Sequence, residues 1–180
     1  MKKRQSISIT NGCGKWGNLM AKIEFKDIDE YAEKLGILWK ESEGMIERAV
    51  YAGADVVADE IKKGLQALPV EEGFGTPEHP LNGVGRRQKA DLIDGFGLAP
   101  MQNDDGYINT KAGFDGYGSI QTKAYPNGQP NAMLMRSIES GTSFRNKHPV
   151  IRTAVNRSKG KSQEAMQKTI EKEIDSWFGK

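Results

Sequence analysis

The strongest pattern in the chain is a run of apolar residues at helical spacing between Glu43 and Leu68. The apolar positions recur at intervals of four, four, three, four, four and three residues: Ile46, Val50, Ala54, Val57, Ile61, Leu65 and Leu68. This spacing predicts a core-facing amphipathic helix about 39 Å long, at about 1.5 Å per residue, which Pro69 ends. Small residues in it allow close approach of a packing partner: Ala49, Gly53, Ala54 and Ala58.

Other helices are predicted on both sides of this one. Residues 21–25 are typical of a short strand, and Asp27 begins a first helix that ends near Glu41, before Ser42. Residues 86–93 form a short helix or turn, and Asn131 caps a helix that runs to about Ser140. Pro149 takes the first position of a final helix that ends near Trp177, with Gly160 as a weak point.

Turn dipeptides about ten residues apart divide the region between residues 94 and 130: Asp94-Gly95, Asp105-Gly106, Asp115-Gly116 and Asn127-Gly128. Between them lie three predicted strands, at residues 96–102, 107–114 and 119–125. The order of elements predicts a single-domain α+β fold, in which an antiparallel β-meander is packed by the long central helix and the C-terminal helix. Residues 69–85, rich in Gly and Pro, form a long loop that we expect to be mobile or ordered by a partner.

Charge is distributed unevenly along the 180 residues. The 26 basic and 24 acidic residues give a net charge of +2, which is too weak to imply a nucleic-acid or membrane partner. Residues 1–19 hold four basic and no acidic residues, so we treat them as a leader that is flexible or not native, ahead of a domain at residues 20–180. Met20 is then a second possible start, and the alternative is an arm that orders on assembly.

Motifs for catalysis, metals and cofactors do not match in spacing. The glycine-rich segments at residues 12–15 and 83–85 lack the remaining residues of a phosphate-binding loop. The two histidines, His79 and His148, are 69 residues apart with no cysteine nearby, which argues against a zinc site. We therefore expect a non-enzymatic protein without catalytic, metal-binding or cofactor-binding residues.

Two segments carry opposite charge. Residues 27–60 hold ten acidic and three basic residues, net −7, and residues 145–161 hold six basic and no acidic residues, net +6. Such poles suit head-to-tail association of a homo-oligomer or ring. The alternative is that both are solvated faces or pair within one monomer. The candidate interaction residues are Glu43, Glu47, Arg145, Lys147, Arg152, Arg157, Lys159 and Lys161.

Four short runs, in this order and spacing, resemble a phage protein family: YINTKAGFDGY at 107–117, NAML at 131–134, IESGTS at 138–143 and HPVIRTA at 148–154. On these runs the chain is similar to the gene-product-ten family of phage HK-ninety-seven, over roughly residues 21–177. The chain differs from the family at Val150 and Thr153, where phenylalanine and proline are common. We expect the motif residues to serve the fold, with glycines at positive φ and Glu139 bonded to backbone or to Arg152. These residues are Gly113, Phe114, Asp115, Gly116, Glu139, Gly141, Pro149 and Arg152.

The resemblance implies a function in virion assembly. Members of the family are small proteins of long-tailed phages or prophages, described as neck or tail-completion proteins that join head to tail. The expected partners are copies of itself and other neck and tail proteins, without membrane or nucleic acid, and the expected location is the virion after synthesis in the bacterial cytoplasm. Residues 69–85, the leader and the basic block at residues 145–161 are the expected contact surfaces. The alternative is a small nucleic-acid-binding or regulatory protein that uses the same basic block.

Overall fold

The computed structural model describes residues 26–178. The leader and the strand expected at residues 21–25 lie outside the described residues. The chain divides into two compact units, residues 1–41 and 42–180. Of the first unit, the structure describes only the beginning of the first helix, and the packing described below belongs to the second unit.

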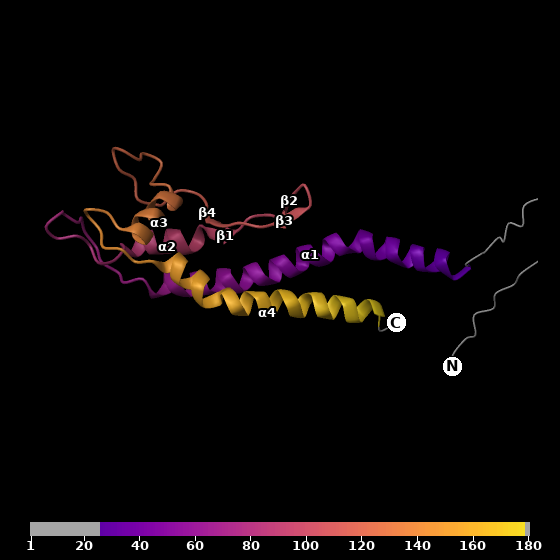
Figure 1. The fold of residues 1–180 in the computed structure, drawn as a ribbon. Helices are drawn as coiled ribbons and strands as arrows, with labels where there is room; N and C mark the ends of the chain where they lie inside the picture. Colours follow the sequence, from indigo (N-terminus) through magenta and orange to yellow (C-terminus); the bar gives the residue numbers. More distant parts are fainter. Residues whose placement is uncertain (1–25, 179–180) are drawn as a thin grey trace, which may run out of the picture. The chain divides into compact units, whose positions relative to one another are not determined.

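The elements confirm the α+β fold class (Figure 1). In chain order they are α1 (Lys26–Ala67), α2 (Arg86–Asp94), β1 (Phe96–Leu98), β2 (Gln102–Asp104), β3 (Tyr107–Asn109), β4 (Ala112–Phe114), α3 (Asn131–Ser140) and α4 (Val150–Phe178). The break expected at Ser42 is wrong, because α1 continues through this position. A single serine destabilises a helix by less than about 1 kcal/mol relative to alanine, which is too little to end it. α4 likewise continues through Gly160.

Within the second unit, α1 and α4 pack as an antiparallel pair. A Cβ atom on Gly64 would lie 2.6 Å from Cγ1 of Val150, at the start of α4, while Gly53 approaches Ser162 and Met166 further along it. The small residues singled out in the sequence do permit this approach, since Ala49 and Ala58 are 1% and 3% exposed. The apolar stripe faces the core only in its second half, because Ile46 is 41% exposed.

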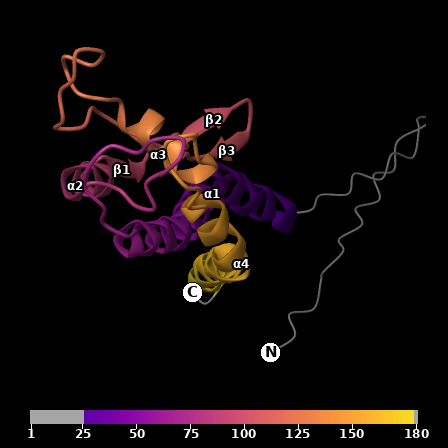
Figure 2. The same ribbon diagram turned by 90° about the vertical axis from the view of Figure 1, so that its left-hand side faces the viewer.

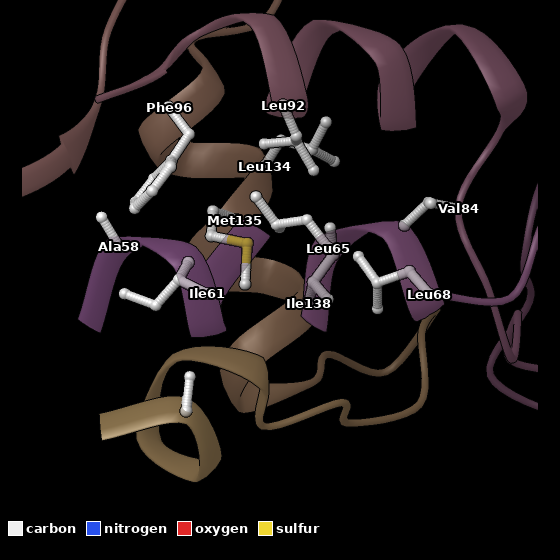
Figure 3. Packing of buried hydrophobic residues seen from close by; sticks show 11 residues of the cluster. Ala58, Ile61, Leu65, Leu68, Val84, Leu92, Phe96, Leu134, Met135 and Ile138 are labelled. Carbon is white, nitrogen blue, oxygen red and sulfur yellow. The ribbon is translucent and has the colours of Figure 1, made fainter. Parts of the chain in front are cut away.

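The core lies between the C-terminal part of α1, α2, α3 and the start of α4 (Figure 3). Leu65, Leu92 and Ile138 are completely buried, one from each of α1, α2 and α3. Side chains from both loops and helices complete the cluster: Ala58, Ile61, Leu68, Val84, Phe96, Leu134, Met135 and Ala154. The helices that carry the loops are therefore fixed against one another.

The predicted meander is a single interrupted hairpin. β1 pairs with β4 and β2 with β3, both antiparallel, and Asp105 and Gly106 at positive φ close the turn as the Asp-Gly dipeptide predicts. The ladder breaks at Pro100, which has no N–H to donate.

The third strand, expected at residues 119–125, is absent from the described part of the chain, where these residues form a loop. The carboxylate of Asp91 on α2 accepts hydrogen bonds from the backbone N–H and hydroxyl of Ser119, at 2.7 and 3.0 Å. These bonds hold the loop toward α2, so that it does not return alongside β4.

Asn131 is the first residue of α3 and not its cap, as the sequence had suggested. Its side chain turns to the backbone of neighbouring elements. Nδ2 donates to the carbonyl oxygens of Asp115, at 2.8 Å, and of Asp91, at 3.3 Å. Asn131 thereby joins the start of α3 to the end of α2 and to the turn after β4.

Candidate interaction surface

A groove opens where three loops meet over α2 and α3. The loops are residues 69–85, 115–130 and 141–149, and the groove has a volume of about 610 Å³. Such a volume lies within the range of about 300–1,000 Å³ that is usual for ligand pockets. Figure 2 turns the loop-bearing side of the second unit toward the viewer.

Large apolar side chains around this groove are exposed. Phe74 is 98% exposed, Phe144 is 52% exposed and Ile120 is 37% exposed, one from each loop. Leu81 and Leu134 also line the groove, and Leu134 is part of the core. Exposed apolar groups gathered around a concavity are typical of sites where a protein binds a partner. We call Phe74, Ile120 and Phe144 the apolar rim.

Backbone contacts fix two of the loops against each other. Leu81 donates from its N–H to the carbonyl oxygen of Phe144 at 3.0 Å, and Asn146 donates to the carbonyl oxygen of Leu81 at 2.8 Å. A side chain at Gly75 would collide with the carbonyl oxygen of Phe144. The loop at residues 69–85 is thus irregular as predicted, and hydrogen bonds join it to the loop at residues 141–149.

The charged groups of the groove are held by the chain itself. Arg145 is half-buried and donates to the carbonyl oxygen of Gly83 and to Oε1 of Gln88. Its burial lowers the pKa of the guanidinium. Glu72 accepts from the N–H of Arg86 at 2.8 Å, and Asp91 holds Ser119. The apolar rim is therefore the main feature that the groove offers to a partner.

A second hollow, of about 480 Å³, lies between the end of α1 and the start of α4. Its apolar lining includes Leu68, Val150 and Ala154, and its charged lining consists of Glu60, Lys63 and Arg157 together with His148. Nε2 of His148 lies 2.8 Å from the carbonyl oxygen of Asn82, so this histidine joins two loops. We call this feature the helix hollow.

The predicted basic block is not one uniform surface. Arg145 braces the loops, whereas the other five side chains are exposed: Lys147, Arg152, Arg157, Lys159 and Lys161. On the acidic side, Glu43 accepts from Nδ2 of Asn103 on the hairpin, and Glu47 is half-buried on α1.

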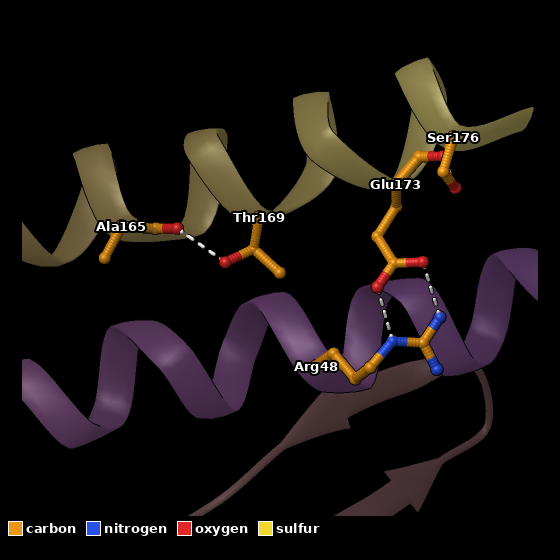
Figure 4. Close-up of polar contacts among 5 residues, drawn as sticks. All are labelled: Arg48, Ala165, Thr169, Glu173 and Ser176. Atoms are coloured by element: carbon orange, nitrogen blue, oxygen red, sulfur yellow. Dashed lines mark hydrogen bonds and ion pairs between the residues drawn. The ribbon is translucent and has the colours of Figure 1, made fainter. Parts of the chain in front are cut away.

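Opposite charges of α1 and α4 lie near each other in the same chain. The acidic Glu60 of α1 lies near the basic Arg157 and Lys161 of α4, and the basic Arg48 of α1 lies next to the acidic Glu173 of α4. Arg48 of α1 makes a two-pronged ion pair with Glu173 of α4, at 2.8 and 3.0 Å (Figure 4). The pKa of Glu60 is lowered mainly by its hydrogen bond from Lys63, and further by the nearby charges of Arg157 and Lys161. Of these contacts, only the electrostatic effect of Arg157 and Lys161 on Glu60 joins the acidic segment to the basic block. Pairing within one monomer and pairing between copies therefore both stay predictions.

The motif residues of the phage-family resemblance take part in the fold's turns and caps. Gly116 and Gly141 both have a φ of 74°, whereas Gly113 lies in strand β4. The Phe114 ring packs on that of Phe96 with centroids 5.1 Å apart. The Glu139 carboxylate accepts from the backbone N–H groups of Ile151 and Arg152, at 2.9 and 3.0 Å, and so caps α4 just after Pro149.

The apolar rim was not predicted from the sequence. Phe74 is the one aromatic residue of a loop rich in Gly, Pro and Glu, where it lies between Gly73 and Gly75. An aromatic residue in such a loop was the available sign of an exposed contact residue. Ile120 had been assigned to a strand, and Phe144 lay outside every expected element. Their proximity depends on how the loops pack, which local pattern does not reveal.

Among residues 26–178, no group of three or more His, Cys, Asp or Glu side chains is placed to hold a metal ion. Over the same described range, every helix is too short or too polar to cross a membrane.

Comparison with known proteins adds no relative. No family model, no curated protein and no solved structure matches this chain.

Proposed function

We propose that this protein is a non-enzymatic structural component of a long-tailed phage or prophage that acts in head–tail joining or tail completion. The observation that carries the proposal is the apolar rim of Phe74, Ile120 and Phe144 around a groove of about 610 Å³. Such a surface, mounted on helices fixed by a common core, suits a protein that docks on other proteins. The motif runs at residues 107–154 give the docking its proposed setting in the phage neck.

In this proposal the protein is made in the bacterial cytoplasm and ends in the virion, bound to copies of itself and to other neck or tail proteins. Arg145, which binds the carbonyl oxygen of Gly83, and Glu139, which caps α4, contribute to this function because they hold the loops of the apolar rim in place. Binding through preformed loops costs less ordering entropy than binding through a segment that folds on contact.

The test is a deletion of the gene in the phage or prophage that encodes it. We expect DNA-filled heads and separate tails that fail to join, and restoration of joined particles by the gene supplied in trans. Mass spectrometry of the purified restored particles should detect the protein. Normal particles from the deletion strain would reject the proposal.

The alternative, binding of nucleic acid through residues 145–161, makes a different prediction. Its affinity for duplex DNA should fall steeply with salt, because each neutralised phosphate releases counterions. A titration of the full chain with DNA between 50 and 200 mM salt separates the two functions. We expect no saturable binding at the higher concentration.

A further inference from the structure

We propose that Phe74 of one copy inserts into the helix hollow of a second copy, so that the chain associates head to tail. This inference rests on the proposed function and adds to it by naming a second copy as one partner and the helix hollow as its receptor. It uses two features of the same unit that the fold leaves without a partner.

The first feature is the exposure of Phe74. Its side chain is 98% exposed, the highest value among the large apolar residues that are described as exposed. The loop that carries it is joined to the loop at residues 141–149 by the bonds of Leu81 and Asn146, and Gly75 packs against the carbonyl oxygen of Phe144. Aromatic side chains that become buried at the centre of an interface commonly supply much of its binding energy.

The second feature is the hollow. Its volume of about 480 Å³ is ample for one aromatic side chain, and small or apolar residues line much of it: Gly64, Ala67, Leu68, Pro69, Pro149, Val150 and Ala154. The hollow begins at Pro69, where the loop of Phe74 also begins, yet Phe74 does not fill it in its own chain, as its exposure shows.

The charges of the loop and of the hollow support the insertion of Phe74 into the hollow. The loop at residues 69–85 carries Glu71, Glu72 and Glu78 and has no Lys or Arg. The hollow is lined by two basic residues, Lys63 and Arg157, and by one acidic residue, Glu60, which pairs with Lys63 at 2.9 Å. An acidic loop around an aromatic anchor therefore meets an apolar hollow whose charged lining is net positive. Complementary charge of this kind selects partner and orientation.

The pairing joins two different surfaces, so it is heterologous. The pair then keeps one free loop on one copy and one free hollow on the other, and repetition gives a closed ring or an open helical filament. Arg157 of α4, which lines the hollow, thereby becomes a contact residue for the acidic loop at residues 69–85.

The experiment uses two complementary variants of the full chain. Phe74→Ser removes the anchor and leaves the hollow, whereas Ala67→Trp fills the hollow and leaves the anchor; both positions are exposed. Sedimentation velocity should show oligomers for the wild type and monomers for each variant alone. An equimolar mixture of the two variants should give a one-to-one dimer, because one anchor and one hollow remain. The expected loss of affinity for Phe74→Ser is at least about tenfold.

Tyr107→Ser is the matched control, since Tyr107 is 70% exposed on the hairpin and lies outside both features. It should assemble like the wild type, and circular dichroism should show all variants folded. A monomeric wild type, unchanged assembly of Phe74→Ser, or a monomeric mixture would overturn the inference. Detection of the protein in joined particles is a separate readout, so the proposed function can stand or fall independently.

Discussion

The hydroxyl of Ser162 donates a hydrogen bond to the backbone carbonyl oxygen of Gly53 at 2.9 Å, from one helix of the α1–α4 pair to the other. Ser162 is 8% exposed, and a Cβ atom on Gly53 would lie 2.6 Å from Cγ of Met166 and 3.0 Å from this hydroxyl. The bond therefore depends on the absence of a side chain at position 53. Replacing Gly53 by valine should destabilise the protein by about 1–3 kcal/mol, because the added atoms force the helices apart.

Urea denaturation followed by circular dichroism measures this change. The control is Gly160→Ala, since Gly160 lies on α4 with no atom within 4 Å of its would-be Cβ. It should stabilise the protein by up to about 1 kcal/mol, as expected for an exposed helical position. A Gly53→Val protein as stable as the wild type would show that the two helices do not pack this closely.

Asn131 offers a second test of the support beneath the groove. Its Nδ2 bonds join α2 and the turn after β4 to α3, and the residue is 3% exposed. Asn131→Ala removes this donor from two part-buried carbonyl oxygens, of which that of Asp91 keeps its bond from the N–H of Gly95, and should cost about 0.5–1.5 kcal/mol. Asn131→Asp should cost more, because it places a carboxylate against those same oxygens.

Denaturant midpoints of the two Asn131 variants give the comparison. Asn156→Asp, at an exposed position on α4, is the control for the change of amide to carboxylate. An Asn131→Asp protein no less stable than Asn131→Ala would contradict the donor role of Nδ2.

The cap of α4 by Glu139 predicts a loss of stability on its removal. Glu139→Ala deletes both acceptors for the N–H groups of Ile151 and Arg152 and should cost about 0.5–2 kcal/mol. Amide hydrogen exchange should then be faster in the first turn of α4 than in the wild type. Glu164→Ala, at an exposed position on the same helix, should leave that turn unchanged.

The ion pair of Arg48 and Glu173 predicts a dependence on pH. The hydrogen bond from Arg48 lowers the pKa of Glu173, so its contribution to stability is present above the unfolded pKa and is lost as pH falls through the folded pKa. The free energy of unfolding of the wild type should exceed that of Glu173→Gln at pH 7, and the difference should shrink as the pH falls through and below the ordinary pKa of a glutamate. Urea denaturation over this pH range, in low salt, measures it. A difference that grows as the pH falls would contradict the assignment.

Much of the fold could be predicted because its elements have local signals. The spacing from Ile46 to Leu68 indicates a helix, found as α1, whose apolar stripe is buried in its second half, and Asp105-Gly106 indicates the hairpin turn. The helices α2 and α3 begin and end within one residue of their predicted limits. These signals depend only on residues that are close together in the sequence, so they can be recognised without the structure.

The remaining features depend on contacts between distant residues. The loop at residues 115–130 replaces a predicted strand because Asp91, 28 positions earlier, binds Ser119. Arg145 was counted with the surface charges, yet it reaches Gly83, 62 positions away, and braces the loops. The apolar rim combines residues 74, 120 and 144, so no local pattern could have shown it.

We propose that the apolar rim serves assembly of the phage particle. Electron microscopy of particles from the deletion strain, supplied with either Phe144→Asp or Tyr107→Asp, tests this proposal most directly. Both side chains are exposed, at 52% and 70%, but only Phe144 belongs to the rim. The account predicts joined particles with Tyr107→Asp and separate heads and tails with Phe144→Asp, although both proteins fold. Joined particles in equal number with both variants would contradict it.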